Sequence, residues 1–207
     1  TALPYHQITL QLHDQTDHVA WQTTLPFEPP TINRWRDPHL FRLPPFLENG
    51  RYHWHLTLCP TCPLMPLNTL DITAPNRNYT LPPLTHPLTN TLFADTITLH
   101  GATITTTDQL TIDLIWETNT ILTTSYRVFI HLLGPDNNIL AQSDAEPANW
   151  TRPTTSWTPT EIIIDQHTIP LPNPPPTTFT LRLGLYNPTT NHRLPLPTNQ
   201  DHLILPP

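Results

Sequence analysis

The chain has 207 residues with nine Arg, no Lys and 16 acidic residues, so its net charge is −7 and only 12% of its residues are charged. This composition excludes nucleic acid as an expected partner, because phosphate binding depends on clustered Lys and Arg. The lack of a basic cluster also argues against binding to an anionic membrane surface, and no apolar run reaches the ~18 residues that span a bilayer. We therefore expect no nucleic-acid partner and no membrane insertion by this segment.

Proline and threonine dominate the composition, with 28 Pro and 37 Thr against 4 Gly. Polar, Pro-rich sequences of this kind are often disordered, but the spacing of the apolar residues predicts folded strands. Apolar residues recur at every second position from Leu110 to Trp116 and from Phe179 to Leu185, which is the period of half-buried β-strands. The faces marked as buried in this way include Leu114, Trp116, Ile130, Leu132, Leu181 and Leu183.

In chain order, short apolar and β-branched runs predict strands throughout, and no segment shows the 3.6-residue period of a long helix. Asp14 to His18 and Gly134 to Asn138 have the composition of hairpin turns. Prolines fall mostly between the runs, where they end strands and protect sheet edges. The predicted strands cover residues 5–13, 18–24, 37–43, 51–58 and 68–73, and then residues 92–101, 109–117, 126–134, 138–144, 161–169, 178–186 and 201–205.

The same unit occurs twice in the chain. Residues 8–22 align with residues 128–142 at a constant offset of 120, so Ile8 aligns with Val128 and Leu12 with Leu132. The alignment continues with small gaps, and a repeat of this kind fixes the architecture before it indicates a function. Further aligned positions are Pro30-Thr31 with Pro153-Thr154, Trp35 with Trp157, and Tyr52, Trp54, Leu56 and Leu58 with Phe179, Leu181, Leu183 and Leu185.

The repeat predicts two domains, residues 1–77 and 91–207, joined by a Pro-rich connector over residues 78–90. Seven short strands in the second copy predict an antiparallel β-sandwich, immunoglobulin-like or jelly-roll-like. Two of these strands precede the aligned region, and their equivalents in the first copy would lie before Thr1. We therefore predict an all-β chain of two tandem β-sandwiches, the first incomplete at its N-terminus. We expect an upstream segment of the same polypeptide, or another protein chain, to complete it.

The second copy contains a characteristic series of segments. They are Phe93–Gly101, Leu110–Trp116, Tyr126–Gly134, Ala141–Asp144, Pro153–Trp157, Glu161–Asp165, Leu183–Pro188 and Arg193–Pro195. In these segments the copy resembles the C-terminal extracytoplasmic β-sandwich region of bacterial membrane glycosyltransferases of the protein-mannosyltransferase type, which use polyprenyl-phosphate sugars. The resemblance covers about residues 91–205, and the family pattern has Gly where Thr160 and Thr178 stand. It implies an extracytoplasmic appendage at the cell surface, because the catalytic transmembrane part of that family lies outside this segment.

Cys59-Pro-Thr-Cys62 has the CxxC spacing of thiol–disulfide exchange or of half a zinc site. His53 and His55 lie just upstream, so a four-ligand metal site is one alternative and a pair of free thiols is another. The motif follows a predicted strand instead of opening a helix, and the chain has no second CxxC. Together with an extracytoplasmic location, this favours a disulfide between Cys59 and Cys62. We predict no metal and no cofactor.

Carboxylates and tryptophans lie close together in the second copy, as they do in sites that bind or cleave glycans. Trp157 aligns with Trp35, and a tryptophan present in both copies is typical of core packing. We therefore predict no catalytic residue and no enzyme. Glycan binding is predicted at exposed Trp150, with hydrogen bonds from Asn149 or Asp144. The remaining carboxylates of this segment are Glu161 and Asp165, and Asn78 and Asn149 each begin a glycosylation sequon.

Two classes of function remain. The first is a non-catalytic recognition or spacer module at the cell surface, an appendage of a membrane glycosyltransferase-like protein that contacts glycan or a neighbouring protein. The second is a structural subunit of an extracellular assembly in which strands pair between chains. An exposed, Trp-lined groove favours the first class, and an unpaired sheet edge filled by another chain favours the second.

Overall fold

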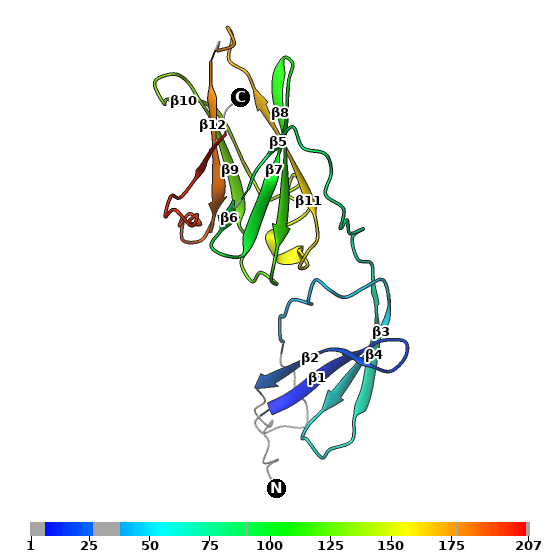
Figure 1. The fold of residues 1–207 in the computed structure, drawn as a ribbon. Helices are drawn as coiled ribbons and strands as arrows, with labels where there is room; N and C mark the ends of the chain where they lie inside the picture. The colour runs from blue at the N-terminus through cyan, green and yellow to red at the C-terminus, as the bar shows by residue number, and fades with distance from the viewer. Residues whose placement is uncertain (1–6, 27–37, 90, 177, 206–207) are drawn as a thin grey trace. The chain divides into compact units, whose positions relative to one another are not determined.

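The computed structural model describes residues 7–26, 38–89, 91–176 and 178–205, and it shows an all-β chain, as predicted (Figure 1). Among the described residues the one helical element is a 3₁₀ turn, η1 (Thr154–Ser156). None of these residues lies in a helix long and apolar enough to cross a membrane. The chain divides into two compact units, Thr1–Asn76 and Arg77–Pro207, which are described separately below.

The first unit contains one antiparallel sheet. Its strand order is β2-β1-β3-β4, so the hairpin β1–β2 lies beside the hairpin β3–β4. One face of this sheet carries a small apolar cluster centred on Leu12, Leu47 and Tyr52, with Trp21 and Trp54 packed against it. The strands are β1 (Gln7–His13), β2 (Val19–Pro26), β3 (Gly50–Thr57) and β4 (Met65–Ile72).

The strand predicted at residues 37–43 is wrong for its described part, residues 38–43, which form no strand. Pro38, Pro44 and Pro45 lack the N–H that a β-ladder needs. The alternation has another cause, since Phe41 lies on the face of the sheet with its ring 5.3 Å from that of Trp21 and 5.6 Å from that of Trp54. The segment therefore packs flat on the sheet without pairing with it.

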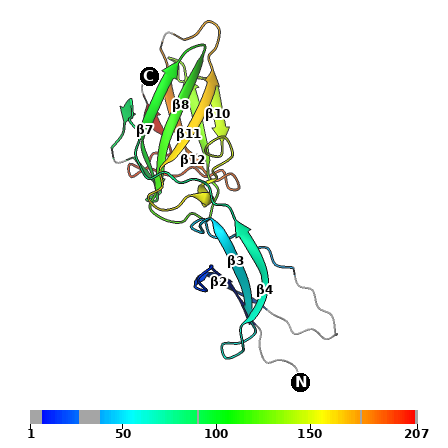
Figure 2. The same ribbon diagram turned by 90° about the vertical axis from the view of Figure 1, so that its right-hand side faces the viewer.

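The second unit is a sandwich of two antiparallel sheets. One sheet has the order β11-β8-β7-β5, with β6 also paired to β7, and the other has the order β10-β9-β12-β13. Figure 2 shows β8 between β7 and β11, with β10 beside β11. The strands are β5 (His86–Pro87), β6 (Leu92–Phe93), β7 (Ile97–Thr106), β8 (Gln109–Thr118), β9 (Arg127–Leu133), β10 (Ile139–Ala145), β11 (Ile163–Pro170), β12 (Thr180–Tyr186) and β13 (Leu203–Leu205).

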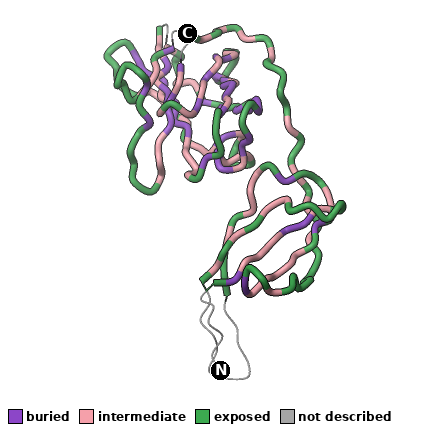
Figure 3. The backbone as a smooth tube through the Cα atoms, turned by 60° about the horizontal axis from the view of Figure 1, so that its bottom comes forward, coloured by how far each residue is buried: buried purple, intermediate pink, exposed green. Residues whose placement is uncertain are grey.

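The core of this sandwich lies where the alternating pattern predicted it. Leu114, Trp116 and Ile130 are 0% exposed, as are Leu132, Leu181 and Leu183, so the predicted set of buried residues is confirmed. The strand β11 is buried at every second residue over its whole length. Buried backbone recurs along the strands of this unit in Figure 3.

The sequence repeat is also a repeat of register. In the first unit Leu10 pairs with Leu56 across β1 and β3, and in the second unit the aligned residues Ile130 and Leu183 pair across β9 and β12. Both hairpins have a β-bulge at the same place. The register shifts between Leu12 and His13 in the first unit and between Leu132 and Leu133 in the second. The sheet β2-β1-β3-β4 is therefore the counterpart of β10-β9-β12-β13, in the same strand order. The described residues of the first unit contain no counterpart of the other sheet.

The predicted connector belongs to the second unit over most of its length. Asn78 accepts a backbone hydrogen bond from Ile162, and residues 86–87 form β5, which pairs with β7. Gly101 is required at this crossing, because a Cβ there would overlap the carbonyl oxygen of His86. These contacts place residues from Arg77 onwards with the second sandwich.

Candidate binding site beside strands β10 and β11

The segment that follows β10 has a strained backbone. Ala148, Asn149 and Trp150 all have positive φ angles, of 52°, 52° and 69°. L-residues pay about 1–2 kcal/mol each for this left-handed conformation, and such strain is concentrated at ligand sites. Hydrogen bonds from Trp150 N to Glu146 O and from Arg152 N to Pro147 O close the turn.

A buried carboxylate holds this turn in place. Asp165 on β11 is 0% exposed, and its Oδ1 accepts a 2.7 Å hydrogen bond from the backbone N–H of Ala148. Its Oδ2 accepts hydrogen bonds from Trp116 Nε1 at 3.2 Å and from His167 Nε2 at 3.0 Å. Asp165 was not among the binding residues predicted from the sequence. It nevertheless fixes the turn that carries two of them, Asn149 and Trp150.

A pocket of about 450 Å³ opens at this edge of the sandwich. Its polar side chains are amides, hydroxyls and one imidazole, with no carboxylate and no guanidinium among them. Pockets of this size are typical of small-molecule sites. The residues that line it are Ser143, Ala145, Ala148, Asn149, Ile164, Gln166, His167 and Thr168.

Ser143, His167 and Asp165 form a hydrogen-bonded chain beneath the pocket. Ser143 Oγ lies 2.8 Å from His167 Nδ1, and His167 Nε2 donates to Asp165. Serine hydrolases use a chain of this composition to move a proton from the serine. Ser143, however, lies within the β10–β9 ladder opposite Ile130 and not on the strained turn that exposes a nucleophilic serine. Here the chain joins the edges of the two sheets and orients the Ser143 hydroxyl.

The exposed side of the turn carries an aromatic cluster. Trp150 is 51% exposed, and the Arg127 guanidinium lies 4.9 Å from the centre of its ring. Tyr186, which pairs with Arg127 across the strands, donates to both carboxylate oxygens of Asp144, at 2.8 and 3.0 Å. Burial and the bond to Asp144 raise the pKa of the Tyr186 hydroxyl above its ordinary value, so this donor stays protonated at neutral pH.

The three predicted binding residues are thus divided between two places. Asn149 lines the pocket, while Trp150 and Asp144 belong to the aromatic cluster, linked through Arg127 and Tyr186. Asp144 is adjacent to Ser143 on β10 and therefore faces the opposite side of the sheet. The turn from Ala148 to Trp150 connects the two places, because Ala148 and Asn149 line the pocket and Trp150 belongs to the aromatic cluster.

The other residues singled out in the sequence are structural. Glu161 is 0% exposed and is bound by Arg77 Nη1 and Arg152 Nη2, each at 2.6 Å. Trp157 is fully buried in the core, whereas its aligned partner Trp35 lies outside the described residues. Thr160, where the glycosyltransferase pattern has Gly, has a φ of 66°, in the region that favours glycine.

Both cysteines lie just after β3, and the structure joins Cys59 and Cys62 in a disulfide. The alternative metal site with Cys59 and Cys62 as ligands is therefore excluded in this structure, because both sulfurs are in the disulfide. The sequon residues Asn78 and Asn149 are both exposed. Among the described residues one other group has the composition of a metal site, and it lies on β1, β3 and the first hairpin turn.

No family model matches the chain, and no curated protein matches it significantly.

Proposed function

We propose that the chain is a non-catalytic recognition module of the cell surface that binds a neutral glycan at the edge formed by β10 and β11. The observation that carries this proposal is the pocket of about 450 Å³ lined by uncharged hydrogen-bonding side chains, next to a half-exposed tryptophan. A sugar ring has hydroxyls around its rim and C–H groups on its faces. A glycan therefore uses both kinds of contact.

The polar contacts come from Asn149, Gln166 and Thr168, whose side chains supply both donors and acceptors. Ser143 adds a hydroxyl that is held by His167, and its oxygen keeps a lone pair available as an acceptor. Trp150 supplies a flat apolar surface one residue beyond Asn149. A polysaccharide that runs around this edge would place one sugar in the pocket and a later one on Trp150, on the other side of the turn.

The proposed location outside the cytoplasm has two supports. One is the resemblance to the extracytoplasmic region of membrane glycosyltransferases, whose pattern has Gly where Thr160 stands with a φ of 66°, in the region that favours glycine. The other is the disulfide between Cys59 and Cys62, since disulfides persist mainly in oxidising compartments.

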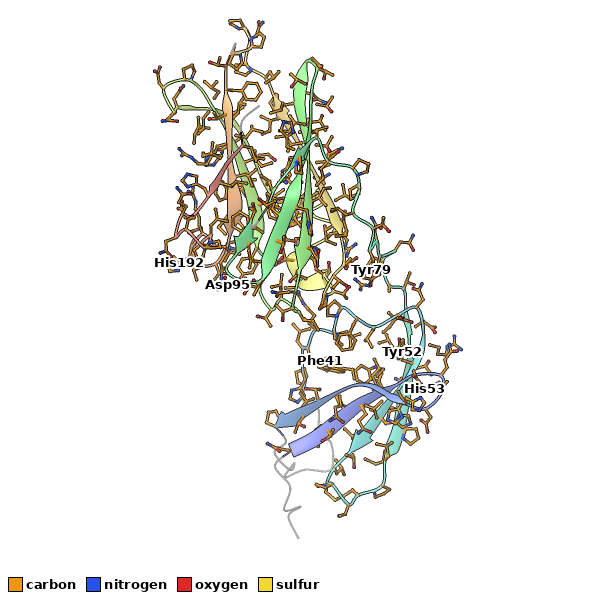
Figure 4. The ribbon with its side chains drawn as sticks, in the orientation of Figure 1. Phe41, Tyr52, His53, Tyr79, Asp95 and His192 are labelled. Atoms are coloured by element: carbon orange, nitrogen blue, oxygen red, sulfur yellow. A yellow bond between two sulfur atoms is a disulfide. The ribbon has the colours of Figure 1, made fainter. Side chains whose placement is uncertain are left out.

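Binding of the whole chain to an array of neutral polysaccharide fragments tests the proposal, followed by calorimetry on any fragment that binds. Trp150→Ala should weaken binding between about twofold and about tenfold, the range expected for loss of one aromatic stacking contact. Asn149→Ala should also weaken glycan binding, because it removes a hydrogen-bonding side chain from the pocket lining. Tyr79→Ala is the matched control, because Tyr79 (labelled in Figure 4) is 58% exposed in the same unit and is not one of the residues that line the pocket. Equal affinity of Trp150→Ala, Asn149→Ala and the wild type would contradict the proposed site.

We also propose a second function, subunit of an extracellular assembly, in which the sheet of the first unit packs against a second copy of itself. Leu10 and Leu56 on its apolar face are only half-buried, whereas the aligned Ile130 and Leu183 are 0% exposed beneath the opposite sheet of the sandwich. Two such faces packed together would restore the two-layer arrangement. Light scattering after size exclusion should then give a dimer. A monomer at micromolar concentration would exclude this assembly without affecting glycan binding.

A further inference from the structure

The outward face of the first sheet brings together three metal-ligating residues from separate elements. His13 ends β1, His55 lies on β3, and Asp17 lies in the hairpin turn between β1 and β2. One ring nitrogen of each histidine and one carboxylate oxygen of Asp17 all lie within 4.8 Å of one another. The two imidazoles are neighbours, with ring centres 4.2 Å apart.

The closest pair in this cluster is joined by a hydrogen bond. His13 Nδ1 lies 2.9 Å from Asp17 Oδ1. A tetrahedral zinc ion with bonds of about 2.0–2.2 Å to nitrogen and oxygen separates two ligand atoms by about 3.3–3.6 Å, so the two atoms would move apart by roughly half an ångström. The pair could therefore hold a cation with little movement of either side chain.

Both nitrogens of His13 face acceptor oxygens. Nδ1 faces Asp17 and Nε2 lies 3.1 Å from Gln11 Oε1, yet a neutral imidazole has only one N–H to donate. A cation on Nδ1 resolves this conflict, because Nε2–H then donates to Gln11. Metal-bound histidines almost always donate their second nitrogen in this way. The Gln11 amide is itself oriented, since its Nε2 donates to Gln22.

His55 adds an independent observation. Its Nδ1 is buried and has no hydrogen-bond partner. A buried polar atom without a partner is destabilising, so His55 Nδ1 is available for a ligand. This ring packs against His13, the most buried member of the cluster at 6% exposed.

The second copy shows that the fold does not require these residues. The aligned positions there are Leu133 for His13, Asn137 for Asp17 and Arg182 for His55. The two turns nevertheless have the same pair of backbone hydrogen bonds, and φ is 63° at Asp17 and 59° at Asn137. Ligating residues at all three positions of one copy, and at none of the other, indicate a role beyond the turn.

We propose that His13, Asp17 and His55 bind a divalent transition-metal ion such as Zn²⁺. Two imidazoles and one carboxylate suit this class of ion better than Ca²⁺ or Mg²⁺, which prefer all-oxygen ligands. The ion would fasten the exposed hairpin turn at residues 14–18 to strand β3. Water would complete its coordination on the exposed side, where Asp17 lies.

Calorimetric titration of the metal-free, disulfide-intact chain with ZnCl₂ tests this site. We expect one ion per chain, and its release by EDTA. The variants Asp17→Asn and His13→Leu copy the residues of the second unit, so they should fold and should weaken binding at least about tenfold, the scale on which even outer contacts of a metal site act. His53→Gln is the control, because His53 (labelled in Figure 4) is an exposed histidine paired opposite His13 and is not one of the three clustered residues.

A cobalt-substituted sample gives a second readout, since Co²⁺ bound to nitrogen and oxygen ligands has visible absorption bands. These bands should disappear in His55→Gln and persist in His53→Gln. The proposal is overturned if the wild type takes up no ion, or if His53→Gln reduces uptake as much as Asp17→Asn does. It is also overturned if the metal-site variants lose the fold measured by circular dichroism in EDTA, because the residues would then be structural.

Discussion

The buried carboxylate of Glu161 gives a test of what stabilises the second sandwich. Its Oε1 accepts from Arg152, while its Oε2 accepts from Arg77 and from the backbone and side chain of Thr158. The side chains of Arg77 and Arg152 are 15% and 18% exposed, against 0% for Glu161. One anion thus balances two largely buried cations.

The substitution Glu161→Gln keeps the shape of the side chain and removes its charge. Two guanidinium groups then lose their carboxylate in an environment that water reaches poorly. Breaking a buried ion pair from one side costs about 3–5 kcal/mol. We expect a loss of this size in the free energy of unfolding of the second unit.

Urea unfolding measures this loss, with near-ultraviolet circular dichroism of the buried Trp116 and Trp157 as the probe of the second unit. Asp201→Asn is the control in the same unit. Asp201 pairs with Arg193, and their side chains are 53% and 35% exposed. Exposed ion pairs of this kind contribute about 0–1 kcal/mol to stability. An unfolding midpoint for Glu161→Gln within the error of the Asp201→Asn midpoint would refute the reasoning. It would show that the two arginines are satisfied without the carboxylate.

Four further predictions follow from individual side chains. Leu132→Ala should cost about 2–5 kcal/mol of unfolding free energy, because it opens a cavity in a fully packed core; a loss below about 1 kcal/mol in urea unfolding would contradict the packing. Burial and the nearby Arg193 charge lower the pKa of His131 below 6.5, so the unfolded chain binds this proton more readily and stability should fall as the pH drops through 6.5. An NMR titration midpoint at or above 6.5 would oppose that sign. Ser143 should form no adduct with a fluorophosphonate probe, and mass spectrometry showing one would make the Ser143 chain catalytic. Replacing Cys59 by Ser should change stability little through loop entropy, because the closed loop is short, and a large drop in the melting temperature of the first unit would show that the disulfide has another role.

The strands and their pairing follow from the sequence because two independent patterns agree. Alternation marks one face of each strand, and the repeat requires aligned residues to occupy the same place. Leu10 opposite Leu56 and Ile130 opposite Leu183 satisfy both patterns. A one-residue slip would turn the apolar residues to solvent in both copies, so the register is strongly determined.

Residues 38–43 show where alternation misleads. Phe41 and Leu43 are spaced like the inward residues of a strand, and they do face the apolar cluster. A chain that lies across a sheet can satisfy the same spacing through side chains alone. The flanking prolines prevent a strand here, because proline has no backbone N–H to donate to a neighbouring strand.

The binding site could be predicted only in part. Asn149 and Trp150 stand out by residue type, but the left-handed turn that separates them depends on Asp165, which is fifteen or more residues away in the chain. The link from Ser143 to His167 joins two sheets, so no local spacing reports it. The one local signal is that Asp165 and His167 occupy the buried positions of β11, where only paired polar groups are tolerated.

The two copies carry their distinctive chemistry at different places on one scaffold. The shared positions are the inward ones, such as Leu12 and Leu132, and they hold the register of the sheet. The histidine cluster uses outward positions and the hairpin turn of the first copy, whereas the pocket uses the β10–β11 connection of the second. Because the second copy folds with other residues at the places where the first has ligating ones, each site can change without loss of its sheet. The positions at which aligned residues differ in chemistry are therefore the ones at which function should be sought, and residues 13, 17 and 55 and the segment 146–152 meet that criterion.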